Sequence, residues 1–169
     1  MKTIRIAKLK PNPAGKDRPT VGPLDPSQLA AEWVDIYNFG TSTVNPLGVE
    51  LYNKAYSAAH PLGTWKSVLN LPYLMLGPAQ TLRVHAGGDR GFGVIRAEDL
   101  FGVEHHVFTG RDQYVWNNRQ GDTAGLWELQ PMAWIDLASY DPNPPEGVIL
   151  VRIGAKLLPT PQMYYRRRA

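Results

Sequence analysis

The sequence predicts an all-β domain of the sandwich or barrel type, on three observations. Apolar and polar residues alternate with a period of two in many short runs, which is typical of strands with one buried face. Sixteen glycines and fifteen prolines among the 169 residues stand between these runs and indicate many turns. Helical periodicity is almost absent. A layered α/β arrangement is therefore disfavoured.

About nine strands are expected, at intervals that suit a sandwich or barrel. Two short segments, Pro26–Ala31 and Ala97–Phe101, are expected to form single helical turns, the first capped by Asp25 or Ser27. The proline-rich stretch Pro11–Pro26 is expected to be a surface loop. In chain order the expected strands are Ile4–Ile6, Glu32–Asn38, Leu47–Leu51, Thr81–His85, His106–Phe108, Tyr114–Asn117, Leu126–Leu129, Ala133–Leu137 and Val148–Ile153. Their alternation assigns to the core Val34, Ile36, Leu51, Leu82, Val84, Trp116 and Leu126.

Length and composition indicate one folded domain, which we place at residues 1–158, followed by a basic C-terminal tail at 159–169. The chain has no cysteine, which excludes disulfides, iron–sulfur clusters, thiolate zinc sites and cysteine nucleophiles. No apolar run approaches the length of a membrane span, and Met1–Lys10 lacks the apolar stretch of a signal peptide. We therefore expect a cytoplasmic protein.

The charge is unevenly distributed along the chain. Residues 1–18 carry six bases and one acid, residues 19–151 seven bases and fourteen acids, and residues 152–169 five bases and no acid. An acidic body disfavours a nucleic-acid-binding domain, because such domains carry their basic excess on the folded surface. If nucleic acid binds, we expect weak, sequence-independent contacts through the ends. The candidate phosphate contacts are Arg166, Arg167, Arg168, Lys8 and Lys10, with Lys16 and Arg18 as further candidates.

Three separated segments carry a family resemblance. Glu32–Gly40 reads EWVDIYNFG, Pro46–Leu51 follows as a second strand, and Val115–Leu126 contains WNN followed by GDT. In this order the segments resemble the lamin tail domain, an immunoglobulin-like module of nuclear lamins that also occurs in bacterial proteins. The resemblance covers roughly residues 2–140. Two positions depart from the pattern: Val49 replaces a tryptophan, and Gly77-Pro78 inverts a proline-glycine turn.

The resemblance implies an immunoglobulin-like β-sandwich with a C-terminal extension, of the bacterial type, and a non-catalytic module for contacts with other molecules. The matching residues are expected to be structural: Glu32, Trp33, Val34, Ile36, Asn38, Gly40, Trp116, Asn117, Asn118, Gly121, Asp122 and Thr123. From the residues themselves, Asn38–Gly40 should end a strand, with glycine in a left-handed turn position, and Asp122 should fasten a hairpin through backbone amides. Trp33, Trp116, Trp127 and Trp134 are expected in the core rather than on a ligand platform.

The sequence contains only weak candidates for catalytic or cofactor-binding motifs. His105 and His106, with Glu104 and Asp112 nearby, are the one cluster with metal-ligand chemistry, but adjacent strand residues point to opposite faces. His60 and His85 stand alone, and the glycine-rich stretch 86–93 lacks the lysine and helix of a phosphate-binding loop. We expect no cofactor and no enzymatic activity. A metal-dependent hydrolase centred on His105, His106 and Asp112 remains the opposing hypothesis.

The segment Val148–Ile153 is apolar at every position before Arg152, which predicts burial on both faces. Either it closes the sheet of its own chain, or it packs against a second copy. The sequence therefore leaves open a homodimer formed through this strand and recruitment of an unidentified protein partner.

Overall fold

The protein is an all-β molecule built on one curled sheet, seen in a computed structural model that describes residues 2–15 and 24–160. Within this part of the chain, ten strands lie in the order β4-β3-β7-β8-β10-β9-β1-β2-β5-β6. The strands are β1 (Ile4–Lys10), β2 (Trp33–Asn38), β3 (Val49–Ala55), β4 (Thr64–Asn70), β5 (Thr81–His85), β6 (His105–Phe108), β7 (Asp122–Glu128), β8 (Ala133–Tyr140), β9 (Leu150–Ile153) and β10 (Lys156–Pro159). Two short helices, α1 (Pro26–Ala30) and α2 (Ala97–Leu100), and the 3-10 turn η1 (Phe92–Val94) complete it.

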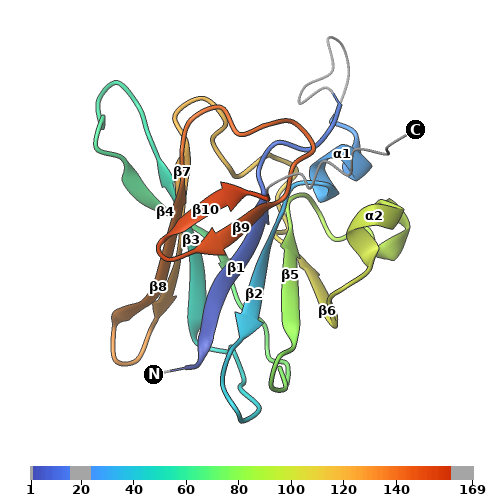
Figure 1. The fold of residues 1–169 in the computed structure, drawn as a ribbon, viewed down its shortest axis with the longest axis vertical. Coiled ribbons are helices and arrows are strands. Elements are labelled where there is room, and N and C mark those ends of the chain that lie inside the picture. Colours follow the sequence, from blue (N-terminus) through green and yellow to red (C-terminus); the bar gives the residue numbers. More distant parts are fainter. Residues whose placement is uncertain (1, 16–23, 161–169) are drawn as a thin grey trace, which may run out of the picture.

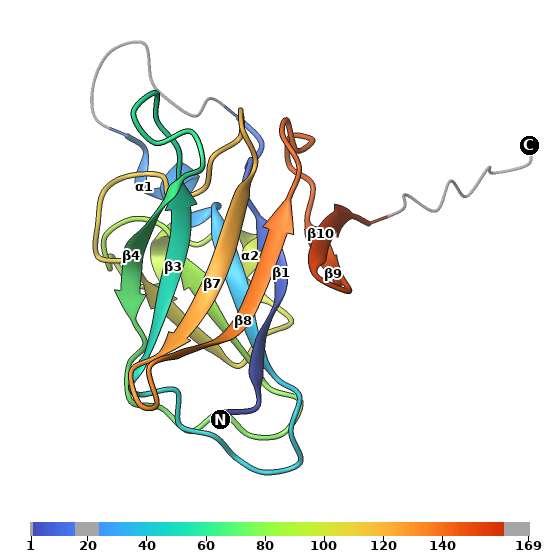
Figure 2. The same cartoon turned by 90° about the vertical axis from the view of Figure 1, so that its left-hand side faces the viewer.

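The sheet has two four-stranded parts joined by a small hairpin. In Figure 2 the part β4-β3-β7-β8 faces the viewer and the part β1-β2-β5-β6 lies behind it. The hairpin β9–β10 bridges them: β9 pairs with β1 at two positions, and β10 meets β8 at Lys156 and Ser139 (Figure 1). On the opposite side β4 and β6 end the sheet.

The main core lies between the two parts of the curled sheet and draws residues from both. The seven core residues predicted from alternation are all buried there. Alternation placed six of them correctly because each of their strands turns one face inward, whereas Trp116 is buried although its segment forms no strand. The fully buried contributors include Ile4, Ile6, Leu9, Val49, Leu76 and Leu150.

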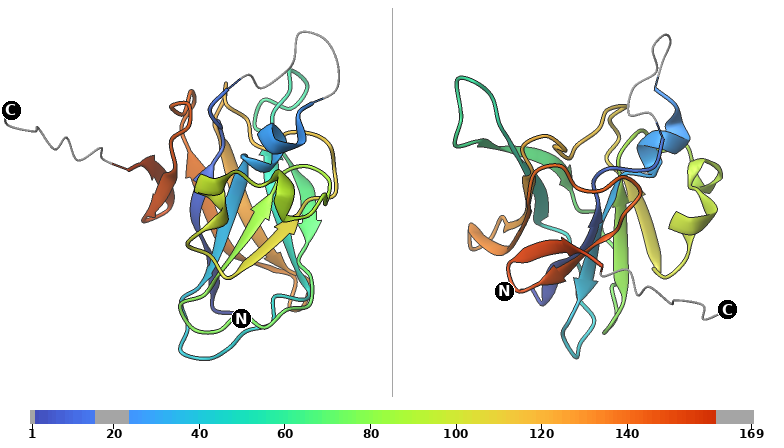
Figure 3. Two further views of the ribbon diagram at one scale, coloured as in Figure 1. Left: turned by 90° about the vertical axis from the view of Figure 1, so that its right-hand side faces the viewer. Right: turned by 45° about the horizontal axis from the view of Figure 1, so that its top comes forward.

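The two helices confirm their predicted positions. Asp25 caps α1, since its carboxylate accepts a hydrogen bond from the Ser27 amide at 2.8 Å, and Pro26 occupies the first turn, where no amide donor is needed. Together α1, η1 and α2 cover the outer face of β2, β5 and β6 (Figure 3, left). No helix in the described residues is long and apolar enough to cross a membrane.

Several strand predictions were wrong. Tyr114–Asn117 forms no strand; its amides at Val115 and Trp116 donate to the buried Glu32 carboxylate at 2.7 and 3.1 Å instead of to a neighbouring strand. Two strands, β4 and β10, were missed. The sequence of β4 mixes polar residues with Trp65 and Val68 because its outer face is open to solvent, so its pattern is weak.

The segment Val148–Ile153 contributes a strand to the interior of the sheet order, but the two faces of this strand are not both buried as predicted. Strand β9, which covers Leu150–Ile153 of this segment, lies between β1 and β10 of the same chain, and Ile153 is 60% exposed. Of the two places expected for this segment, the structure shows the one within its own chain, where β9 pairs with β1 and with β10.

Candidate functional site

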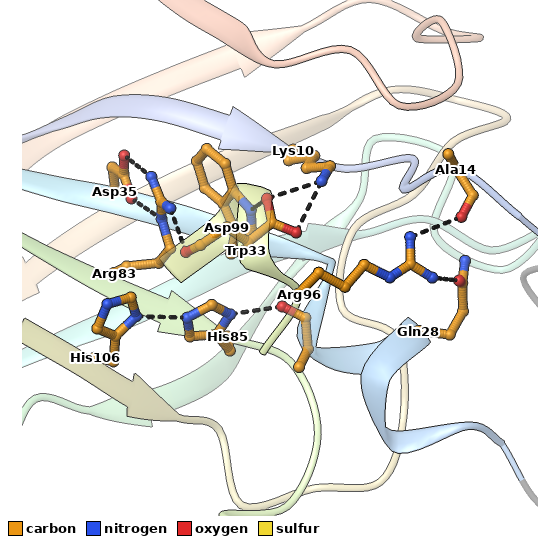
Figure 4. Close-up of polar contacts among 11 residues, drawn as sticks. Lys10, Ala14, Gln28, Trp33, Asp35, Arg83, His85, Arg96, Asp99 and His106 are labelled. Atoms are coloured by element: carbon orange, nitrogen blue, oxygen red, sulfur yellow. Dashed lines mark hydrogen bonds and ion pairs between the residues drawn. The ribbon is translucent and has the colours of Figure 1, made fainter. Parts of the chain in front are cut away.

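A buried polar cluster lies on the outer face of β2 and β5, beneath α2 (Figure 4). Asp99 of α2 accepts hydrogen bonds from the Trp33 indole at 2.7 Å and from Lys10 Nζ at 2.8 Å. Arg83 binds both carboxylate oxygens of Asp35, at 2.7 and 2.8 Å, and donates to the Asp99 carbonyl at 2.7 Å. Its guanidinium also stacks on the Trp33 ring at 3.7 Å.

This cluster is electrically balanced, since two cations face two carboxylates. Burial raises the pKa of the Asp35 carboxyl, and the hydrogen bonds from Arg83 oppose that rise. Buried pairs of this kind are costly to break because removing one partner leaves an uncompensated charge. We conclude that the cluster anchors α2 on the sheet and leaves Lys10 buried and paired with Asp99, unavailable to a phosphate.

A pair of imidazoles extends the cluster towards the sheet edge. His85 Nδ1 lies 2.5 Å from the Ala30 carbonyl, His85 Nε2 lies 2.9 Å from His106 Nδ1, and His106 Nε2 lies 3.1 Å from the Leu100 carbonyl. The prediction that His85 stands alone was wrong: parallel pairing of β5 with β6 brings the two rings together.

Proton counting defines the state of this pair. The two outer contacts of the pair end on carbonyl oxygens, which can only accept hydrogen bonds. Three hydrogen bonds would therefore need three protons on the ring nitrogens, whereas two neutral imidazoles carry only two. Burial lowers the pKa of His85 to about 4 and also lowers the pKa of His106. At neutral pH one of the three contacts therefore lacks a proton.

His106 lines an open pocket of about 300 Å³ at the end of the sheet. The edge strands β4 and β6 both contribute to its wall, together with the loop that carries Phe92. A second pocket, of about 240 Å³, is lined by β4 and by residues 109–115. The Arg111 guanidinium donates to the Ser67 carbonyl at 2.9 Å and so joins the two sides. We call the two pockets together the β4–β6 groove.

The residues of the opposing metal-site hypothesis, His105, His106 and Asp112, do not gather into one site. His106 is turned towards His85, while Asp112 lies on the surface, where it accepts hydrogen bonds from the Gly88 amide and Arg90. In residues 2–15 and 24–160 no three histidine, aspartate or glutamate side chains gather in a way that could hold a metal ion.

The residues that carry the family resemblance are engaged in structural hydrogen bonds. The Asn38 side-chain amide donates to the carbonyls of Ser42, Leu76 and Gly77, and its oxygen accepts from the Gly40 amide. Gly40 is not left-handed, contrary to expectation. It is required because a Cβ there would lie 2.3 Å from the Thr3 hydroxyl oxygen.

Asp122 holds together three segments. Its carboxylate accepts hydrogen bonds from the amides of Lys54, Thr123 and Asn117 and from the Asn53 side chain. It thus joins β7 to the neighbouring β3 and to the loop before β7, rather than fastening a hairpin. Burial raises its pKa to about 6 against these hydrogen bonds.

The tryptophans divide between buried and surface positions. Trp33 and Trp116 are buried, the first under α2 and the second in the main core. Trp127 and Trp134 are half-buried on the outer face of the sheet, where Trp134 packs against Trp127, Trp65 and Tyr52. The prediction of a core position was therefore wrong for these two.

The other predicted contact residues fall in different places. Lys8 is exposed on β1, whereas Arg166, Arg167 and Arg168 lie outside the described residues. Comparison with models of protein families finds no family that matches the chain, and comparison with curated proteins finds no match.

Proposed function

We propose that the chain is a non-catalytic, lamin-tail-like interaction module that binds an extended segment of a partner polypeptide in the β4–β6 groove. The observation that carries the proposal is that the two end strands of the sheet line the first pocket together and that β4 continues into the wall of the second. Strand edges present backbone donors and acceptors that a further strand can use. Recognition by strand addition combines such bonds with pockets for alternate side chains.

The two pockets differ in the side chains they would accept. Phe92, Phe108 and Leu69 make the first one largely apolar, whereas Lys66 and Arg111 line the second. The groove therefore favours a segment with an apolar residue followed or preceded by a polar or acidic one. A second copy of the chain is one source of such a segment, so self-association belongs to the same proposal.

The proposal includes the assignment of the fold as an immunoglobulin-like β-sandwich. Two four-stranded parts that enclose a core are compatible with it. The hydrogen bonds made by Glu32, Asn38 and Asp122 support it further, because these are residues on which the resemblance depends.

Selection of random short displayed peptides against the full chain tests the proposal. We expect enriched peptides with an apolar anchor, whose affinity falls about tenfold in Phe92→Ala, since buried aromatic anchors dominate such interfaces. Phe92 is 64% exposed, so its removal should spare the fold. Phe101, which is 75% exposed and does not line the groove, provides the control variant Phe101→Ala.

Equal affinity of both variants, or no enrichment at all, would overturn the proposal. Light scattering over a range of concentrations then identifies the source of the segment. Self-association that weakens in Phe92→Ala and not in Phe101→Ala points to a second copy, and a constant single-chain mass points to another protein.

A further inference from the structure

A basic groove lies on a different face, over the outer side of β1. It is open, has a volume of about 310 Å³ and runs between the β9–β10 hairpin and β5. Its lining residues are Arg5, Ala7, Lys8, Asp35, Tyr37, Thr81, Val151 and Arg152.

A β-bulge places the two exposed cations of β1, Arg5 and Lys8, on one face. Arg5 pairs with Tyr37 and Ile6 with Ile36, but Lys8 pairs with Asp35, so one residue is inserted between positions 6 and 8. Without the bulge, Arg5 and Lys8 would point to opposite faces, because strand side chains alternate. The bulge thus turns Lys8 to the same outer surface as Arg5.

Among the residues that line the groove, the charges leave an excess of two cations, and the Glu104 carboxylate lies beside it, where it accepts a hydrogen bond from the Thr81 amide at 2.7 Å. Asp35 is neutralised by Arg83 through two hydrogen bonds, and Arg152 is bound to Asp136 at 2.8 and 3.0 Å. In the described part of the chain, neither Arg5 nor Lys8 forms an ion pair.

Neutral donors accompany these cations. The hydroxyls of Tyr37 and Thr81 line the groove and make no hydrogen bond to another described residue. The Arg5 guanidinium lies over the rings of Tyr37 and Phe39, at 5.7 and 5.6 Å, which limits its freedom and keeps its donors at the groove.

We infer that this groove binds a phosphate group. Two uncompensated cations match the roughly two negative charges of a phosphate monoester near neutral pH, and two hydroxyl donors add neutral hydrogen bonds to its oxygens. The ligand is either the phosphate monoester of a small molecule or two neighbouring phosphodiesters of a nucleic-acid backbone, each of which carries one negative charge. The inference does not depend on the β4–β6 groove, which involves other residues.

Titration of the full chain with inorganic phosphate, followed by amide NMR, tests the site. We expect saturable shifts at β1, Tyr37 and Thr81, and about a tenfold weaker affinity in Arg5→Gln and in Lys8→Gln, as charge-assisted contacts predict. Arg90→Gln and Arg119→Gln remove exposed cations outside the groove and should leave the affinity unchanged.

Titration with a fluorescent single-stranded oligothymidylate shows which kind of molecule carries the phosphate group. Tighter binding than inorganic phosphate, lost in the same two variants, assigns the group to a nucleic-acid backbone; binding of phosphate alone assigns it to a small molecule. Failure of both probes, or equal affinity in the groove variants and the control variants, overturns the inference. Phe92→Ala should leave both titrations unchanged, so failure of one proposal is distinguishable from failure of the other.

Discussion

At the scale of single residues, His85 and Asp122 are buried titratable groups with opposite effects on folding. The lowered pKa of His85 means that the unfolded chain binds its proton more strongly than the folded chain. Its contribution to stability is therefore complete above pH 6.5 and is lost as the pH falls towards 4. The raised pKa of Asp122 has the opposite effect, because the folded chain binds this proton more strongly than the unfolded chain. The contribution of Asp122 to stability is therefore lost as the pH rises from 3.8 to about 6.

The first prediction concerns the His85 ring. Because desolvation disfavours the imidazolium, its titration midpoint should lie at about 4 instead of its ordinary 6.5. Side-chain NMR of the imidazole carbons across this pH range measures the midpoint. A midpoint near 6.5 would show that the ring is not buried against Ala30 and His106 as described.

The second prediction concerns Asp122→Asn. An asparagine retains one acceptor oxygen and turns an NH₂ group towards backbone donors, so we expect a loss of about 1–3 kcal/mol in the free energy of unfolding near neutral pH. Urea denaturation measures this loss, with the exposed Asp112→Asn as control.

The same variant should also change the pH dependence of stability. Between pH 4 and 6 the free energy of unfolding should rise more steeply with pH in Asp122→Asn than in the unmodified chain, because the opposing carboxyl has been removed. Identical slopes in the two proteins would contradict the raised pKa.

At the scale of elements, the β9–β10 hairpin joins the two four-stranded parts through few backbone pairs. Its attachment depends on side chains as well: Leu150 and Leu157 are fully buried in the main core, and Arg152 reaches Asp136 of β8. The hairpin is therefore a structural part of the domain. The sequence prediction of a C-terminal extension beyond the family resemblance gains a physical role from these contacts.

The third prediction tests this role with two apolar residues of the hairpin. Leu157 is 1% exposed, and Leu157→Ala should lower the free energy of unfolding by about 2–5 kcal/mol, the usual cost of a core cavity. Ile153 is 60% exposed, so Ile153→Ala should change the free energy of unfolding by less than about 0.5 kcal/mol. Chemical denaturation measures both. A similar small loss in the two variants would mean that the hairpin does not pack on the core.

At the scale of the whole molecule, one core connects both parts of the sheet. Residues of β1, β2 and β5 pack with residues of β3, β7 and β8 in the same cluster. Separate unfolding of either part would expose the apolar face of the other, so the two parts should depend on each other for stability.

The fourth prediction is a single cooperative unfolding transition. Tryptophan fluorescence and far-ultraviolet circular dichroism should give coincident denaturation curves, because a domain with one core unfolds as a unit. Two separated transitions would contradict the assignment of residues 1–158 to one domain.

The sequence by itself determined the all-β class, most strands, both helical turns and the inward residues, because these depend on local periodicity and capping. It could not determine non-local pairing. Parallel pairing of β5 with β6 brings His85 to His106, and the strand order places β9 within the sheet of its own chain, one of the two positions that its composition left open. The basic groove was equally hidden, since an alternating pattern assigns Arg5 and Lys8 to opposite faces and a bulge reunites them. Register, bulges and strand order are set by contacts between residues far apart in the chain, and these are decided only when the tertiary structure forms.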